Sequence, residues 1–567
     1  MTHRPTVHGT RHAISAGHYL AAAAGFSILE GGGNAIDAGV AAGIALGVLQ
    51  PDLVDFAGVA PIMIRLADGT IESIAGLGWW PKTIPADLFM REHGGKIPAG
   101  VLRTVVPAAP DAWITALRRH GTLRFADVAA AAIRFAAEGF AVYPLLERSI
   151  GSHVAEYQRW ASNTAIFLPG GRAPKTGEKF VQTDLARTIQ FMADQDRAAG
   201  PDRLAGLDAA HHAFYRGDIA RAIVRFQEQE GGYLSMADMA EYGSAIEPVV
   251  RRSWRGHELV TCGAWCQGPA LQQALALVEH VGIDGLAHNS ADYLHRLVEC
   301  LNLAMADREY YFGDPRFTDV PVDWLLNPAT IARRAAALRH DRAFGQMPGA
   351  LERPGGASGG VFAETKADLP KVEADTSYCC VIDRWGNAFS ATPSDGSASV
   401  PVVPGLGITP SGRGSQSRPD PRHPAGVAQG KRPRLTPNPA MLVTDKGGVM
   451  PFGTPGGDVQ IQAMLQVLLN VMHFGMDPQS AIEAPRVASY SFPSSFAPFE
   501  YFPGRLAVEG RIDRATRDEL AARGHTIQDW ADWTWLAGSV EAILTDPETG
   551  MMGAGADPRR PAYAIAV

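Results

Sequence analysis

A long connection rich in glycine, proline and charged residues divides the sequence, and it ends at a strand that begins with threonine. The connection runs from Phe344 to Asp375, and its composition is typical of a flexible surface segment with a function of its own. The strand that follows begins Thr-Ser-Tyr-Cys-Cys at Thr376. Short strands alternate with helices on both sides of this junction, and no boundary between independent domains stands out. We therefore predict mixed α and β layers built from both parts of the chain.

Hydrophobic periodicity and turn residues place the main elements. Helices are predicted at residues 35–50, 126–138, 289–307 and 459–474. β-Hairpins are predicted at 61–75, 377–392 and 441–452, because two strand-like runs flank a turn that contains an aspartate and a glycine in each case.

Charge and cysteine content exclude several classes of function. With a net charge of −8, the chain is a poor partner for nucleic acid or an anionic membrane. The five cysteines lack C-x-x-C spacing, which predicts reduced packing residues instead of disulfides or a zinc site. The N-terminus shows no signal-peptide pattern, and the longest apolar run, residues 38–49, is too short to cross a bilayer. We expect a cytoplasmic protein.

A threonine that becomes a new N-terminus carries its own catalyst. Its hydroxyl is the nucleophile, and its freed α-amine, with an ordinary pKa of roughly 7.7–8.0, can act as the base. A threonine at the start of a strand is usually only a β-former. The flexible segment before Thr376 and a glycine turn later in the sequence favour the catalytic interpretation.

The glycine turn Phe-Gly-Thr-Pro-Gly-Gly-Asp at 452–458 leads directly into a predicted helix. Consecutive glycines allow backbone N–H groups to point into a cavity, and a helix N-terminus adds positive potential. Such a turn can stabilise the oxyanion of a tetrahedral intermediate. The plainer alternative is a helix start with Asp458 as the N-cap.

Two other glycine-rich patterns carry no chemistry. Gly-Ala-Ser-Gly-Gly at 356–360 fits the G-x-S-x-G pattern of a nucleophile elbow, but it lacks the flanking strand and helix. Gly-Gly-Gly-Asn at 31–34 resembles a phosphate loop without the following Lys-Ser/Thr. The 17 histidines show no metal-ligand spacing, so we predict neither a metal nor a cofactor.

Three separated segments form a pattern that spans nearly the whole chain. They are Leu-Glu-Gly-Gly-Gly-Asn-Ala-Ile-Asp-Ala at 29–38, Met-Ala-Asp-Arg-Glu-Tyr-Tyr-Phe-Gly-Asp-Pro at 305–315, and the glycine turn followed by Leu-Gln-Val-Leu-Leu-Asn-Val at 465–471 and Glu-Ala-Pro-Arg at 483–486. In this order the sequence resembles the γ-glutamyltranspeptidase family of N-terminal nucleophile hydrolases. The resemblance implies a four-layer αββα fold.

The resemblance also implies a precursor that cuts itself between Asp375 and Thr376 through an N-to-O acyl shift. The products are a large subunit of residues 1–375, with the flexible segment 344–375 at its end, and a small subunit of residues 376–567. The two subunits are expected to remain together as a heterodimer in one compact αββα unit. Any higher oligomer is left open.

Site residues are implied by motif match. Thr376 is the nucleophile, Ser394 holds its amine, and Gly456 and Gly457 form the oxyanion hole. Thr436 falls at one of two paired substrate-binding serines.

The sequence departs from the family pattern where the γ-glutamyl group is bound. Leu77 stands where the family has a carboxylate-binding arginine, Gly396 where it has an asparagine, and Gln416 near the position of an aspartate. Leu435 replaces the second of the paired serines. Loss of the arginine removes a bidentate carboxylate contact that other residues replace poorly. We therefore expect an acyl group without a free amino-acid end.

We expect this acyl group to bind against Trp79 and Trp80, although tryptophans at this spacing are more often core residues. Arg413 or Arg103 can supply a replacement anion contact, and each is otherwise a surface charge. The leading hypothesis is an autoprocessed amidohydrolase or acylase that acts on a small-molecule amide. The alternatives are a true γ-glutamyl hydrolase or transferase anchored by Arg413, and an unprocessed scaffold without turnover.

Overall fold

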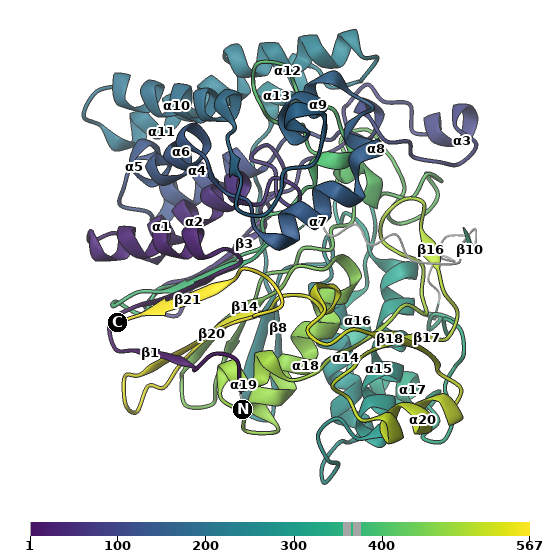
Figure 1. Cartoon of the computed structure of the whole chain (residues 1–567). Coiled ribbons are helices and arrows are strands. Elements are labelled where there is room, and N and C mark those ends of the chain that lie inside the picture. Colours follow the sequence, from purple (N-terminus) through teal and green to yellow (C-terminus); the bar gives the residue numbers. More distant parts are fainter. Residues whose placement is uncertain (1, 355–364, 367–375) are drawn as a thin grey trace.

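Two sheets lie face to face at the centre of the molecule, and helices cover their outer faces (Figure 1). Figure 1 is a computed structural model, which describes residues 2–354, 365–366 and 376–567. The Gly-Ala-Ser-Gly-Gly pattern at 356–360 and Asp375 lie outside the described residues.

The first sheet has seven strands in the order β21-β2-β11-β12-β3-β4-β7, and every neighbouring pair is antiparallel. In that order the strands are Tyr563–Ala566, Ala13–Ala16, Cys379–Ile382, Ala388–Ala391, Ile62–Arg65, Ile71–Ile74 and Ile246–Glu247. The strand that follows the threonine junction, β11, therefore lies in the middle of this sheet.

The second sheet also has seven antiparallel strands, in the order β1-β20-β19-β14-β13-β9-β8. They are Val7–Gly9, Met552–Ala556, Glu541–Thr545, Val449–Gly453, Ala440–Val443, His257–Thr261 and Val250–Trp254. Between the two sheets lies an apolar layer that includes Met63, Val260, Tyr378, Cys380 and Met441.

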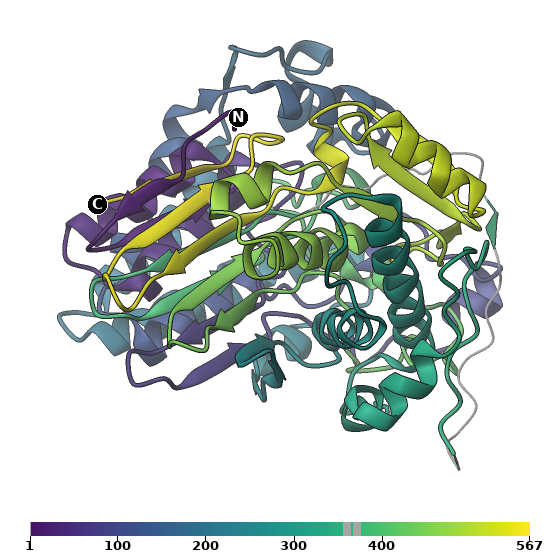
Figure 2. The ribbon, with the colours of Figure 1, turned by 90° about the horizontal axis from the view of Figure 1, so that it is seen from below.

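Each sheet mixes strands from before and after residue 376. In the first sheet β2 pairs with both β11 and β21, and β12 pairs with β3. In the second, β13 pairs with β9 and β20 with β1. Figure 2 shows this mixing as purple N-terminal strands beside yellow C-terminal ones. Backbone hydrogen bonds thus join the described residues on both sides of the junction into one folded unit.

Helices on the two outer faces complete the four layers. The first sheet is covered by α1 (Tyr19–Glu30), α2 (Ala35–Leu49), α4 (Ala109–His120) and α10 (Thr183–Ala198), which share one apolar core with its strands. The second is covered by α14 (Gly268–Val281), α15 (Ala291–Tyr311) and α18 (Gln460–Met472). No helix among the described residues is long and apolar enough to cross a bilayer.

Helix α2 is buried along its whole length, and small residues allow it to approach the sheet closely. Its start is fixed by Asn34, whose side chain accepts hydrogen bonds from the Ile36 and Asp37 amides, while Asp37 accepts one from the Asn34 amide. A Cβ atom added at Gly39 would lie 2.1 Å from the ring of Phe389 in β12. Glycine at this position therefore sets the spacing between helix and sheet.

The predicted elements form, with one exception. The predicted helices at 35–50, 289–307 and 459–474 correspond to α2, α15 and α18, and all three hairpins are present. The helix predicted at 126–138 is instead two helices, α5 (Phe125–Val128) and α6 (Ala130–Glu138). The carboxylate of Asp196 in α10 accepts a hydrogen bond from the Ala126 amide at 2.9 Å. This contact binds the short helix α5 to α10.

The beginning of the connection is bound to α15 and its surroundings. The amides of Phe344 and Leu351 donate to Glu299 and Asp307 at 3.0 and 2.9 Å. The amide of Met347 donates to the Tyr501 hydroxyl at 2.7 Å. The sequence predicts a flexible segment from Phe344 onward, whereas residues 344–351 are held by polar side chains that the composition of the segment does not reveal.

Replacing Gly39 by alanine should destabilise the fold by about 1–3 kcal/mol, because the new methyl group overlaps the Phe389 ring. Gly151→Ala is the matched control, since this exposed glycine of α7 (Pro144–Ser152) has open space around the new Cβ. It should be neutral or stabilising by up to about 1 kcal/mol. Thermal and urea unfolding of both variants measure the difference. Equal stabilities would contradict the close approach of α2 to β12.

Candidate active site

Thr376 lies directly opposite Ser394, and both residues are fully buried. The register of the β11–β12 hairpin, in which Cys379 faces Ala391 and Cys380 faces Ser390, extends outward to this pair. The Oγ1 atom of Thr376 is 2.6 Å from the Oγ atom of Ser394. The spacing of 18 residues in the sequence is thus the spacing that one hairpin needs to bring the two hydroxyls together.

The guanidinium group of Arg413 contacts the Ser394 hydroxyl. One of its Nη atoms donates to Ser394 Oγ, and the other donates to Gln416 Oε1 at 3.3 Å. A carboxylate oxygen of Asp395 lies 3.7 Å from Nε, and the ring of Phe496 packs against the guanidinium. Because Arg413 is buried, its charge acts on the hydroxyl pair with little screening by water.

Asp395 holds this arrangement in a strained backbone conformation. Its φ angle is 126°, which a residue other than glycine adopts at an expense of about 1–3 kcal/mol. Its carboxylate accepts hydrogen bonds from the Ser411 hydroxyl and from the Gly412 amide. Burial raises the pKa of this carboxyl, and the charge of Arg413 opposes the rise.

The glycine turn provides amides at a helix start. Gly456 and Gly457 have φ angles of 121° and 58°, a region that favours glycine. Their N–H groups precede the first hydrogen bonds of α18, where helix amides have no partner within the helix. The alternative that Asp458 caps α18 is wrong, because its carboxylate binds the Ser495 amide at 2.7 Å and pairs with Arg308.

Side-chain contacts join the glycine turn to the hydroxyl pair. Gln416 donates to the Thr436 hydroxyl at 2.8 Å. The Gln267 amide group reaches the carbonyls of Thr436 and Gly457, each at 3.4 Å. The Phe496 ring that covers Arg413 also lies 3.1 Å from the place of a Cβ at Gly457. The structure thus gathers the predicted residues Thr376, Ser394, Arg413, Thr436 and Gly457 in one continuous set of contacts.

Arg103 lines a pocket of about 580 Å³ next to this set, together with Asp395, Gly396 and Gly412. Its Nε and one Nη atom donate to the carbonyls of Pro98 and Ile97 at 2.8 and 3.0 Å. Arg413 is absent from the lining residues of this pocket.

The two predicted tryptophans lie elsewhere. Trp80 is fully buried beneath Gly414, and its indole donates to Ser417 Oγ at 2.8 Å. Trp79 packs against Tyr242. Neither lines the pocket beside Asp395, and their contact with an acyl group stays a prediction.

Sequence reasoning missed Arg560, which lies 184 residues beyond the threonine. This buried arginine directs its two Nη atoms toward the carbonyls of Thr376 and Trp535, each at 3.4 Å. Burial lowers its pKa, and nearby acids such as Glu541 and Asp52 oppose the change. No local motif marks Arg560, Asp395 or Gln267, because each reaches the site through tertiary contacts.

Comparison with known proteins decides the family. The family model of gamma-glutamyltranspeptidase matches residues 21–567. The chain belongs to the γ-glutamyltranspeptidase family. It is therefore an enzyme that hydrolyses or transfers at amide bonds, and its four layers are the αββα fold of N-terminal nucleophile hydrolases.

Three similar proteins are named as acylases or as a glutathione hydrolase-like protein. It is 32% identical to the acylase ACY 1 proenzyme of Pseudomonas sp. (strain SE83), over 96% of this chain and 92% of the relative. It is 30% identical to the glutathione hydrolase-like YwrD proenzyme of Bacillus subtilis (strain 168), over 99% of both. The crystal structure of cephalosporin acylase from Bacillus halodurans superposes with a TM-score of 0.84 at 28% identity, covering 100% of this chain and 98% of the other.

One of the segments that resemble the family forms a buried ionic network. Glu309 of α15 accepts hydrogen bonds from Arg418 and Arg434, the latter at 2.7 Å. Burial acts to raise the pKa of Glu309, but the neighbouring arginines hold it well below its usual range. The adjacent Arg308 pairs with Asp458 of the glycine turn. The network fixes both the loop after Arg413 and the glycine turn against one helix.

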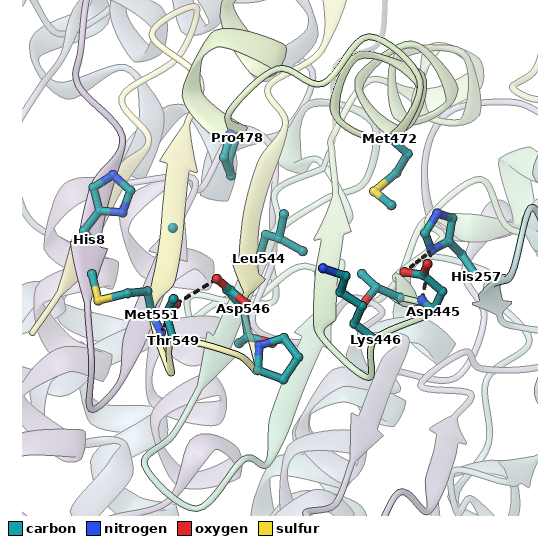
Figure 3. Close-up of a pocket in the computed structure, with 14 residues that line it drawn as sticks. His8, His257, Asp445, Lys446, Met472, Pro478, Leu544, Asp546, Thr549 and Met551 are labelled. Atoms are coloured by element: carbon teal, nitrogen blue, oxygen red, sulfur yellow. Dashed lines mark hydrogen bonds and ion pairs between the residues drawn. The ribbon is translucent and has the colours of Figure 1, made fainter.

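A second pocket, of about 630 Å³, lies away from the hydroxyl pair (Figure 3). It is bordered by the β13–β14 and β19–β20 turns and by one end each of α18 and α19 (Pro478–Glu483). Its wall includes His8, His257, Lys446, Met472 and Met551. It contains none of the predicted site residues.

Glu309→Gln should destabilise the protein by about 3–5 kcal/mol, because it leaves two buried arginines without their anionic partner. Glu258→Gln is the control, since Glu258 pairs with Arg251 at a partly exposed position. The Glu258 substitution should lower the free energy of unfolding by about 1 kcal/mol or less. Thermal unfolding at constant pH and salt compares the variants. A Glu309 variant as stable as the control would show that the network does not support the site.

Proposed function

We propose that the protein is an autoprocessed amidohydrolase of the acylase type that forms an acyl-enzyme on Thr376. The observation that carries the proposal is the buried contact between the Thr376 and Ser394 hydroxyls, with Arg413 donating to Ser394. The similarity to relatives named as an acylase proenzyme and a cephalosporin acylase supports the choice of reaction.

Processing begins with attack of Thr376 Oγ1 on the carbonyl carbon of Asp375. The bond from that carbon to the Thr376 nitrogen breaks, and the nitrogen takes the hydroxyl proton, which leaves an ester on Thr376. Water then hydrolyses the ester to a carboxylate on Asp375, a free hydroxyl and a free α-amine. The products are the subunits 1–375 and 376–567, and the pairing of strands across the junction supports their staying together.

In turnover the free amine takes the Thr376 hydroxyl proton as oxygen attacks the substrate carbonyl. The Gly456 and Gly457 amides stabilise the oxyanion, and the proton passes to the departing amine. Water or a second amine then releases the acyl group. The charge of Arg413 disfavours a protonated amine nearby, and so keeps the base in its neutral form.

The γ-glutamyl alternative is weaker because its anchor is missing. Leu77, at the position of the family's arginine, is buried between the sheets. Arg413, the suggested replacement, already binds Ser394 and Gln416. The relative named glutathione hydrolase-like keeps this second candidate open. Assays of glutathione and a γ-glutamyl anilide beside simple acyl anilides separate the two. The cytoplasmic location stays a prediction from the sequence.

Thr376→Ala should remain one chain, whereas the wild type should give two fragments that meet between Asp375 and Thr376. Intact mass under denaturing conditions measures both. Thr392→Val is the control, because this buried threonine has a hydroxyl without a hydrogen-bond partner among the described residues. It should be processed like the wild type. An uncut wild type would instead support the scaffold alternative.

Arg413→Gln should move the acidic limb of the kcat/KM profile to higher pH by about one unit, because loss of the cation raises the pKa of the Thr376 amine. Arg413→Lys retains a charge and should stay near the wild-type profile. The assay uses processed protein, verified by mass, and the acyl p-nitroanilide that the wild type hydrolyses fastest. Lower activity with an unchanged limb would limit Arg413 to packing.

A further inference from the structure

Asp52 is held at the edge of the 580 Å³ pocket beside the hydroxyl pair by its two neighbours. The carbonyl of Pro51 accepts a hydrogen bond from the Ser397 hydroxyl at 2.6 Å, and the carbonyl of Leu53 accepts one from the Asp395 amide at 3.2 Å. The backbone on both sides of Asp52 is therefore bound to the loop that immediately follows Ser394. Its place relative to the reacting hydroxyls is fixed.

Asp52 is one of the residues that line the 580 Å³ pocket, and neither oxygen of its buried carboxylate has a hydrogen-bond partner of good geometry among the described residues. The residue is only 5% exposed. Burial raises its pKa to about 6, and the interaction with the Ser149 hydroxyl, the backbone of Asp52 and the charges of Arg560 and His153 partly oppose this rise. Buried carboxylates normally accept hydrogen bonds or pair with a cation. The Asp52 carboxylate can therefore still accept a hydrogen bond from a ligand.

Two other acids that line the same pocket, Asp395 and Glu156, have interaction partners. Asp395 is bound by Ser411 and the Gly412 amide, beside Arg413. Glu156 also has a partner. Asp52 is thus the acid of this pocket, within the described part of the chain, that is left to receive a ligand.

We propose that Asp52 binds a protonated primary amine of the substrate, so that the enzyme prefers amides that carry an ammonium group. An ammonium group supplies three N–H donors and a positive charge that can contact the carboxylate directly. The pocket wall adds Tyr157, Trp535 and Leu536, against which a methylene chain can pack. The proposal rests on the proposed function, because it assigns a substrate class to the same site.

Binding tests the proposal without turnover. Titration calorimetry of processed wild type compares 6-amino-1-hexanol with 1-hexanol, two ligands that differ in the ammonium group and contain no amide bond to be hydrolysed. The amine should bind at least about tenfold more tightly. Asp52→Asn should remove that difference, while Glu156→Gln, which removes another carboxylate from the same pocket, should keep it. Thermal unfolding verifies that both variants are folded.

Turnover provides the second arm. A series of ω-aminoacyl p-nitroanilides with chains of four to eight carbons is compared with the uncharged acyl series on the wild type and on Asp52→Asn. The wild type should prefer one charged length by about tenfold or more in kcat/KM, and the variant should lose the preference while it still hydrolyses the uncharged series.

The outcomes separate the two proposals. A binding preference without hydrolysis of any anilide counts against the Thr376 mechanism and leaves the Asp52 site in place. Hydrolysis without a charge preference, or equal binding of the two hexanols by the wild type, overturns the Asp52 proposal. A preference that persists in Asp52→Asn assigns amine recognition to another residue and also overturns it.

Discussion

The candidate active site depends on the pairing of β11 with β2 on one side and with β12 on the other. In the middle of one sheet, β11, which follows Thr376, lies between the N-terminal strand β2 and its hairpin partner β12. Because antiparallel register is fixed once a few pairs form, the position of Ser394 opposite Thr376 follows from pairs several residues away. Any change in the register would separate the two hydroxyls.

A buried ionic network connects the segments on either side of the candidate active site. Glu309, with Arg418 and Arg434, ties helix α15 to the loop after Arg413. Arg308 and Asp458 connect the same helix to the glycine turn. A buried ion pair adds little net stability compared with apolar residues, but its geometry is specific. The network therefore sets the relation between the hydroxyl pair and the glycine turn, which no local element determines.

Some of the site was predictable because local chemistry marks it. A threonine after a glycine- and proline-rich segment, a second hydroxyl 18 residues later, and two consecutive glycines before a helix are all visible in the chain. Their roles came from resemblance to a family, since each pattern has a common structural explanation. The contact of an acyl group with the tryptophans stays a prediction, and in the fold Trp80 packs beneath Gly414.

The sequence by itself determined the main helices and hairpins, the order of the family motifs and the loss of the arginine at Leu77, because these depend on residues close together in the chain. Only the tertiary structure decided that Arg413 contacts Ser394, that Arg560 reaches the Thr376 carbonyl, and that the Asp52 carboxylate has no hydrogen-bond partner among the described residues. The physical reason is distance along the chain. Burial and pairing of a charge depend on residues from separate strands and loops, and these meet only when both sheets have closed.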